Sequence, residues 1–436
     1  MLVLLACADE RPVEPGEGLF ELLSFDADDD VRVLDGPGGL ARAHYSLEGP
    51  NAIHPADWNA DGVPDRAYDA VVATEQNLRR FEFEGYAPPA PEDEFDLDAP
   101  GGSDAFDVYL LDLSGWPFAG LAGRDACTGG RCSTYVVLKS VGGSFDGIVA
   151  HEVFHAVQAA YDRYEPAWLH ESTAEHAANV VFGDRYLSRT TCGLDSMREP
   201  SDCYDAAYGL GLLWEMLEVE VSEDIVRETI EATVEHEGLD ALEVALDAHG
   251  TSIADVWPTF AIWNLKTGIR HDGTGYGIAA SFEGLLATAE GETLRADTRL
   301  EPLAQRFYRL DHPGGDLWIG VAGDPTPLTV SVHPVAGGLP DGPLAAAFGP
   351  VGLPPEGLHV GDVDAGGVWV VVTHTDAYGE EIPIGLCMGD EAVAASCAVS
   401  CAGCASAHAG LPALALLVSL LGLRGRAPPG RATPRR

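Results

Sequence analysis

Hydrophobic positions change their pattern near residue 290 of this chain. Before that point, longer stretches predict helices over 205–237, 239–249 and 252–266, the last opening with the capping pair Ser252 and Asp255. After Thr298 the apolar runs are short and Gly- and Pro-rich turns separate them, which is typical of a small β-sandwich. These runs are Phe307–Leu310, Leu317–Val321, Leu328–Val332 and Val368–Val372.

Two further helices are predicted closer to the N-terminus. No Pro or Gly follows Gly147 until well beyond residue 160, so the apolar stretch from Ile148 to Ala160 can continue as one helix. A second stretch starts at Pro166, a residue suited to the first turn of a helix, and is free of Pro and Gly to Val181. The segment Thr134–Lys139, just ahead of the first helix, predicts a strand.

The first of these helices carries the motif HExxH at residues 151–155. Residues four apart share one face of a helix, so His151 and His155 can reach a single metal ion. Glu152 can then stand beside the open position of the metal as a general base. A helix that carries two histidines by chance is the alternative, so the motif needs a third ligand.

A third ligand is available on the second helix. Hydrolytic zinc sites use three protein ligands and leave one position open, and Glu171 lies one short loop and one helical turn beyond His155. Glu175 shares a helix face with Glu171 and can orient a ligating imidazole, although an exposed helix acid is equally consistent with the pattern. His170 and His176 are further candidates, for which a packing or surface role is the simpler interpretation.

These motifs resemble a known family. The run His151-Glu-Val-Phe-His-Ala-Val-Gln158, followed by Trp168-Leu-His-Glu-Ser-Thr-Ala174, is similar to secreted bacterial zinc metallopeptidases distantly related to the immune inhibitor A proteases. The resemblance covers roughly residues 40–280 and implies an α+β, zincin-like core with a helical C-terminal subdomain. It implies Zn²⁺ as cofactor, His151, His155 and Glu171 as ligands, and Glu152 as the base. Ser172 departs from it, because many such enzymes have Gly after the ligand glutamate.

The expected chemistry is attack of a zinc-activated water on a peptide carbonyl, with Glu152 taking the proton. Tyr208 is our candidate for stabilising the anionic intermediate, with a core tyrosine as the alternative. We expect an extended substrate to pair with an exposed edge of the strand Thr134–Lys139.

A second ion site is suggested by the run from Asp57 to Asp65. Oxygen-bearing side chains at Asp57, Asn59, Asp61 and Asp65, with Gly62 at the turn, match the first part of a Ca²⁺ loop. Tyr68 stands where the bidentate glutamate of an EF-hand belongs, so a looser calcium site and a plain Asx turn both remain open.

Charge and cysteine use indicate an extracytoplasmic protein. The 436 residues carry a net charge of −44 with only two lysines, which disfavours nucleic acid and anionic lipid as partners. We expect the protein to be a monomer whose partner is a protein or peptide substrate. Two local cysteine pairs, neither with the CxxC spacing of a zinc site, predict disulfides that persist only in oxidising compartments. These pairs are Cys127 with Cys132 and Cys192 with Cys203.

Both ends resemble parts of targeting signals. Residues 1–7 look like the end of a signal peptide, with Leu4–Cys7 similar to a lipoprotein cleavage box. Residues 407–436 resemble the sorting signal of myxobacterial surface proteins, in which a short apolar helix, here Leu411–Leu423, precedes an arginine cluster. Such a segment can place the C-terminus in contact with a membrane. Between these ends we expect a catalytic domain at 8–290, a β-sandwich at 291–387 and a linker at 388–406.

The sequence therefore predicts a secreted or surface-attached zinc endopeptidase. Two alternatives stay open: a catalytically silent surface adhesin that works through the β-domain, and a zinc hydrolase of a non-peptide substrate.

Overall fold

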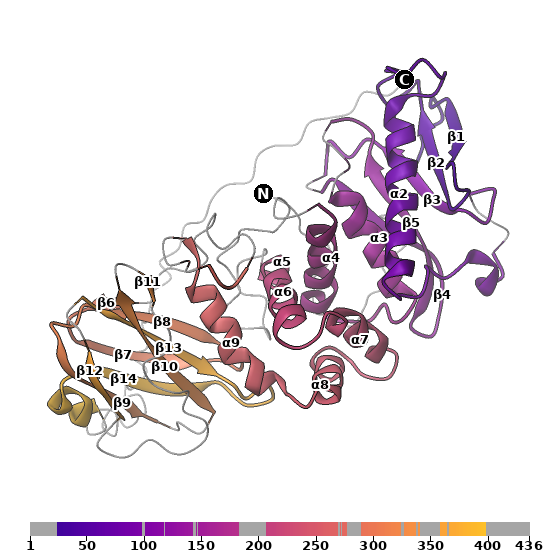
Figure 1. Cartoon of the computed structure of the whole chain (residues 1–436). Coiled ribbons are helices and arrows are strands. Elements are labelled where there is room, and N and C mark those ends of the chain that lie inside the picture. Colours follow the sequence, from indigo (N-terminus) through magenta and orange to yellow (C-terminus); the bar gives the residue numbers. More distant parts are fainter. Residues whose placement is uncertain are drawn as a thin grey trace, which may run out of the picture.

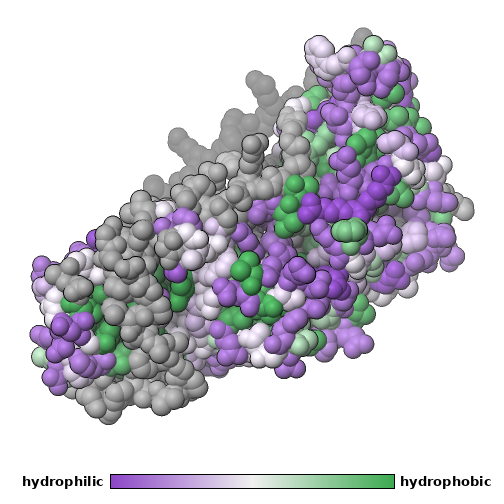
Figure 2. Space-filling view, viewed as in Figure 1, coloured by the Kyte–Doolittle hydropathy of each residue, from purple (hydrophilic) through white to green (hydrophobic). Residues whose placement is uncertain are grey.

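The structure, a computed structural model, describes residues 24–97, 101–116, 118–142, 145, 147–182, 206–268, 271, 273–276, 289–323, 327–336, 339–340, 358–363 and 366–397. Figure 1 shows an N-terminal sheet at one end, the helices α4 to α9 in the middle and the strands β6 to β14 at the other end. Where the residues of the visible face are coloured, hydrophilic ones predominate and hydrophobic ones lie in small separate groups (Figure 2).

The N-terminal sheet has five strands in the order β1-β2-β3-β5-β4. Its strands are β1 (Val31–Asp35), β2 (Ala41–Ser46), β3 (Phe106–Leu111), β4 (Gly120–Thr128) and β5 (Arg131–Lys139). β2, β3 and β5 run parallel, whereas β1 and β4 are antiparallel edge strands. Alternate residues such as Val108, Leu110 and Val136 are buried and share a core with Phe81 and Val153, because one face of the sheet is covered by α2 (Asp65–Phe83) and α3 (Ile148–Ala159).

The position of β5 differs from our expectation. We expected the strand Thr134–Lys139 to offer an exposed edge, but β5 lies between β3 and β4 and is hydrogen-bonded on both sides. The cause is a hairpin: a two-residue Gly129-Gly130 turn folds β4 back onto β5. The exposed edge near the helices therefore belongs to β4.

A helical subdomain follows in the region where helices were predicted, but the predicted stretch 205–237 is divided into three helices. It consists of α4 (Ala167–Phe182), α5 (Ala206–Gly209), α6 (Gly211–Glu220), α7 (Ile225–Ala232), α8 (Leu239–Ala248) and α9 (Ile253–Leu265). The expected cap of α9 is present, because the Ser252 hydroxyl accepts a hydrogen bond from the backbone N–H of Asp255 at 3.3 Å.

The C-terminal part contains two sheets, with strand orders β11-β10-β13-β8-β6 and β12-β9-β14-β7. Buried residues from both sheets, among them Leu317, Val330, Val370 and Leu386, form one cluster between them, which makes a two-layer sandwich. The strands are β6 (Ala289–Gly291), β7 (Leu294–Leu300), β8 (Gln305–Leu310), β9 (Gly315–Ala322), β10 (Leu328–Ala336), β11 (Leu339–Pro340), β12 (Leu358–Val363), β13 (Val368–His374) and β14 (Ile382–Gly389).

The sandwich is joined to the helical subdomain by a continuous core. Phe307, Trp369 and Val371 from the β10-β13-β8 side belong to the same hydrophobic cluster as Trp257 and Phe260 of α9. A buried polar contact adds specificity: the Asn264 amide donates to Gln305 Oε1 at 3.2 Å and accepts from the Tyr276 hydroxyl at 2.7 Å. The sandwich therefore packs on the helices as one body and does not hang from a linker.

The end of the sandwich also differs from our expectation. We assigned 388–406 to a linker, but β14 extends to Gly389 and a helix follows at 391–397. This helix is held by a disulfide between Cys387 and Cys397, and it lies so close to β9 that a Cβ at Gly320 would collide with the Ala394 carbonyl. The sandwich thus includes ten residues of the expected linker.

Several expectations concern residues outside the described ranges. They are the lipobox-like segment Met1–Cys7, the pair Cys192 and Cys203, and the apolar segment Leu411–Leu423. Within the described ranges, the helices are all too short or too polar to cross a bilayer.

Candidate metal centre

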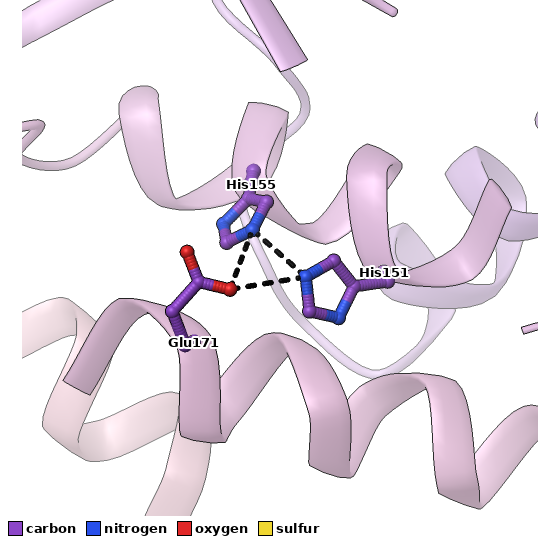
Figure 3. Close-up of side chains that lie close together, drawn as sticks. All are labelled: His151, His155 and Glu171. Carbon is purple, nitrogen blue, oxygen red and sulfur yellow. Dashed lines mark hydrogen bonds and ion pairs between the residues drawn. The ribbon is translucent and has the colours of Figure 1, made fainter. Parts of the chain in front are cut away.

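Two adjacent helices bring together the side chains that the sequence singled out. α3 begins directly after Gly147, whose φ of 49° suits glycine, and carries His151 and His155 one turn apart on one face. α4 packs against α3 and carries Glu171 in its first turns. The two imidazole rings and the carboxylate converge on one point between the helices (Figure 3).

The distances between these three ligand atoms can be compared with those around a tetrahedral zinc ion. The Nε2 atoms of His151 and His155 are 3.0 Å apart, and Oε2 of Glu171 lies 3.3 Å from the first and 3.7 Å from the second. Tetrahedral ligand atoms at zinc bond lengths of about 2.0–2.1 Å lie about 3.3 Å apart, so the three measured distances bracket the expected one. A point about 2.0 Å from all three atoms exists close to their plane.

The Glu171 oxygen at this point is buried. Among the described residues, its only polar contacts are with Nε2 of His151 at 3.3 Å and Nε2 of His155 at 3.7 Å. A buried carboxylate is costly unless a cation meets it. The side chains of His155 and Glu171 are still 16% and 13% exposed, so the point between them is within reach of solvent. The donor set, its spacing and the buried carboxylate all fit a zinc ion with one open position.

The charges around the site favour a cation. Burial by itself lowers the pKa of His151, but hydrogen bonding to Glu171 and the charges of Glu152, Glu171 and Glu175 raise it to about 9. Burial raises the pKa of Glu171, but the charges and hydrogen bonds of His155 and His151 hold it well below its usual range. Negative potential at this point stabilises whatever positive charge occupies it, whether imidazolium or metal ion.

Glu152 lies between the metal-binding helix and the edge strand. Burial raises its pKa, while His151, His155 and the backbone amide of Ala122 on β4 act in the opposite direction. A Cβ added at Gly120 of β4 would come within 2.8 Å of the Glu152 carboxylate and of Ile148. Glycine at position 120 therefore makes room for Glu152 beside the strand.

Glu175 and Tyr208 both lie next to His151. Glu175 is buried, which rules out an exposed helix acid, and its Oε2 is 3.7 Å from Nδ1 of His151. That distance is too long for a direct hydrogen bond. The Tyr208 ring stacks on the His151 ring with centroids 5.8 Å apart, and the residue is half-buried, so it lies beside the site and its role stays a prediction.

The other two histidines have separate environments. His170 is half-buried with its Nε2 3.4 Å from the Asp162 carbonyl, and desolvation together with the charge of His155 lowers its pKa to about 4. His176 is buried against Glu218, with 3.0 Å between Nε2 and the carboxylate. Neither belongs to the group of converging ligand atoms, as the packing interpretation expects.

Two residues at the site were not recognised from the sequence. Gln158 Oε1 lies 2.7 Å from His155 Nδ1, within hydrogen-bond distance, and the Gln158 amide donates to α4. Ser172, where the resembling family has Gly, accepts a hydrogen bond from the buried Trp214 indole at 2.7 Å. The position of Gln158, one helical turn after His155, was the signal that could have revealed this contact. No local signal could have revealed the contact of Ser172, because Trp214 lies 42 positions away in the sequence.

The cysteine and calcium predictions have different outcomes. Cys127 and Cys132 form the predicted disulfide, which closes the β4–β5 hairpin. In the run Asp57–Asp65, Asp57 and Asp61 accept hydrogen bonds from backbone N–H groups of residues 61–63, as in Asx turns. Among the described residues, only His151, His155 and Glu171 form a group of three His, Cys, Asp or Glu ligand atoms, so the calcium site stays a prediction.

Comparisons with known proteins add little. No protein family model matches the sequence, and no curated protein matches it. Two solved structures share a local likeness: the periplasmic inhibitor of g-type lysozyme, PliG, from Aeromonas hydrophila (14% identity, TM-score 0.16) and from Salmonella Typhimurium (9%, TM-score 0.16). They cover 24% and 23% of this chain and 96% of their own. A likeness at this level carries no argument about fold or function.

Proposed function

We propose that this protein is a zinc-dependent endopeptidase that acts outside the cytoplasm or at the cell surface. The observation that carries the proposal is the convergence of His151 Nε2, His155 Nε2 and Glu171 Oε2, with 3.0–3.7 Å between them, next to the carboxylate of Glu152. The mixed sheet with an antiparallel edge strand, backed by the helix that carries the histidines, supports a zincin-like core.

His151, His155 and Glu171 would hold the ion. When bound, zinc supplies a Lewis acid that makes water nucleophilic near neutral pH. Glu152 orients the attacking water, accepts its proton and passes a proton to the leaving amine. The Glu152 carboxylate would act from the space between β4 and α3, where the absence of a side chain at Gly120 gives it room beside the strand.

Tyr208 would stabilise the negative charge that develops on the substrate oxygen. Its ring lies beside His151, and its hydroxyl would donate to the oxygen that becomes anionic when the carbonyl is attacked. Glu175 would stabilise His151 from the other side of the ring.

The substrate would bind along β4. This strand has β5 on one side and no strand on the other within the described residues, and its backbone passes Glu152 at Gly120 and Ala122. An extended peptide can add to such an edge through main-chain hydrogen bonds. That mode favours unfolded or flexible protein segments and places the peptide bond next to the general base.

The disulfides support a location outside the cytoplasm. Cys127–Cys132 and Cys387–Cys397 are stable only in an oxidising compartment. We accordingly retain secretion or surface attachment, and membrane contact through the C-terminal segment, as part of the proposal.

The test is cleavage of a denatured, alkylated protein by the full chain, with and without a zinc chelator. We expect wild type to cleave, the chelator to stop cleavage, and added zinc to restore it. Glu152→Gln should bind zinc but not cleave, and His155→Ala should lose both. Glu75→Gln is the matched control, because Glu75 is equally buried but binds the backbone N–H groups of Gly38 and Leu40, away from the site.

Three results would contradict the proposal. Cleavage by His155→Ala would place the activity elsewhere. Hydrolysis of simple esters without cleavage of any polypeptide would favour a zinc hydrolase of a non-peptide substrate. A folded wild type that binds zinc and hydrolyses neither class would favour the adhesin.

A further inference from the structure

Gln158 connects the two helices of the site through every polar atom of its side chain. Its Oε1 is 2.7 Å from His155 Nδ1, and its Nε2 is 2.9 Å from the His170 carbonyl and 2.6 Å from Thr173 Oγ1. The side chain is 1% exposed, so water does not compete for these bonds. His155 on α3 is thereby tied to the turn of α4 that contains Glu171.

The direction of the Gln158 amide follows from its partners. The His170 carbonyl can only accept. The Thr173 hydroxyl has one hydrogen, and it donates that hydrogen to the Leu169 carbonyl at 2.7 Å, so it offers a lone pair to Gln158. Both partners on α4 therefore require the NH₂ end of the amide, and the oxygen must face His155.

The oxygen of Gln158 in turn decides where His155 carries its proton. An amide oxygen accepts hydrogen bonds and donates none, so Nδ1 of His155 must be the protonated nitrogen. In the neutral ring Nε2 then carries the lone pair, and it is the nitrogen that faces His151 Nε2 at 3.0 Å and Glu171. No deprotonation of the neutral ring is needed before this nitrogen can bind a metal ion.

We propose that Gln158 is a positioning residue that, held by Thr173, fixes the His155 ring in the Nδ1–H form with Nε2 aimed at the metal position. The proposal deepens the proposed zinc site and rests on it for its purpose. The tautomer itself exists in the ion-free protein, so it can be measured whether or not the protein is a peptidase. Glu175, at 3.7 Å from His151, gives that ring a looser partner.

The experiment uses the full chain with ¹⁵N-labelled histidine, freed of metal, at a pH where neutral histidines dominate. The His155 signals are assigned by their loss in His155→Ala. We expect a protonated Nδ1 and an unprotonated Nε2 in wild type and in Thr173→Ser, which keeps the hydroxyl. Gln158→Met, similar in length but without hydrogen-bonding groups, should show a mixture of tautomers and bind zinc about 10- to 100-fold more weakly. Thr173→Val should show the same change to a smaller extent.

The tautomer separates positioning from packing. Either role would lower the unfolding temperature of Gln158→Met, but a packing role alone would leave the tautomer of His155 unchanged. A wild-type His155 with a protonated Nε2, or a Gln158→Met variant with wild-type zinc affinity, would overturn the proposal. If Gln158→Met does not fold, Thr173→Val and Thr173→Ser are compared instead. The same His155 tautomer in both variants would overturn the proposal. If the wild-type protein shows the expected tautomer but binds no zinc, the proposed function is overturned, while the role of Gln158 in fixing the His155 ring still holds.

Discussion

The hydrogen bond between Ser172 and Trp214 gives a sharp prediction about stability. Both residues are 0% exposed, and the indole N–H donates to the hydroxyl at 2.7 Å between α4 and α6. Ser172→Ala removes the acceptor and leaves a buried N–H without water or protein to replace it. The desolvation cost of such a group is about 1–3 kcal/mol, and we expect the free energy of unfolding to fall by that amount.

Glycine, which many members of the resembling family have at this position, should destabilise the protein more than alanine does. Ser172→Gly removes the same acceptor and also introduces glycine within α4, which costs about 1 kcal/mol relative to alanine. The expected loss is therefore about 2–4 kcal/mol. Serine is thus required here by the tryptophan on α6 and not by the chemistry of the neighbouring Glu171.

The assay is urea unfolding of the metal-free protein for wild type, Ser172→Ala, Trp214→Phe and the double variant. Because each single change breaks the same bond, the double variant should be more stable than the sum of the two losses predicts, by about 1–2 kcal/mol. Zinc affinity should stay at the wild-type value, since Ser172 does not touch a ligand atom. Additive losses, or an unchanged Ser172→Ala, would show that the bond contributes nothing.

Three further predictions concern the base, an internal acid and the C-terminal disulfide. Gly120→Ala should lower the cleavage rate about 10- to 100-fold by displacing Glu152, with zinc affinity unchanged, and a wild-type rate would contradict the role of this gap. Burial raises the pKa of Glu165 from 4.5 to about 7 despite its hydrogen bond from Gly238. The folded state therefore holds the Glu165 proton more tightly than the unfolded state does. This proton stabilises the fold fully below a pH of about 4.5, and the stabilisation is lost as the pH rises to about 7. Unfolding of wild type and Glu165→Gln between pH 4.5 and 8 should show a pH-dependent loss of up to about 3 kcal/mol that the variant lacks, and equal slopes would refute it. Cys397→Ser opens a loop between residues ten positions apart and should cost about 3 kcal/mol, with faster proteolysis at 391–397, whereas an unchanged digest would show that packing alone holds that helix.

The parts of the site that the sequence predicted are those that depend on local geometry. His151 and His155 share a helix face whatever the rest of the chain does, and Glu152 is fixed one step round the same helix. The hairpin disulfide Cys127–Cys132 is local in the same sense, since its cysteines are five positions apart. The helix-capping serine at 252 and the change to short strands after residue 298 follow from propensity and periodicity.

Tertiary structure decided whatever depends on which segments become neighbours. β4 has few large apolar residues and no clear alternation, so the pattern did not reveal it as the edge strand, and β5 was assigned that place wrongly. Cys387 and Cys397 pair because the last helix folds back on β9, a packing event that spacing does not encode. The roles of Gln158 and Ser172 depend on the rotation of α4 against α3 and α6, and this rotation is set by side-chain packing along three helices. Local periodicity therefore placed the ligands on their helices, whereas the non-local packing of those helices determined what orients and surrounds them.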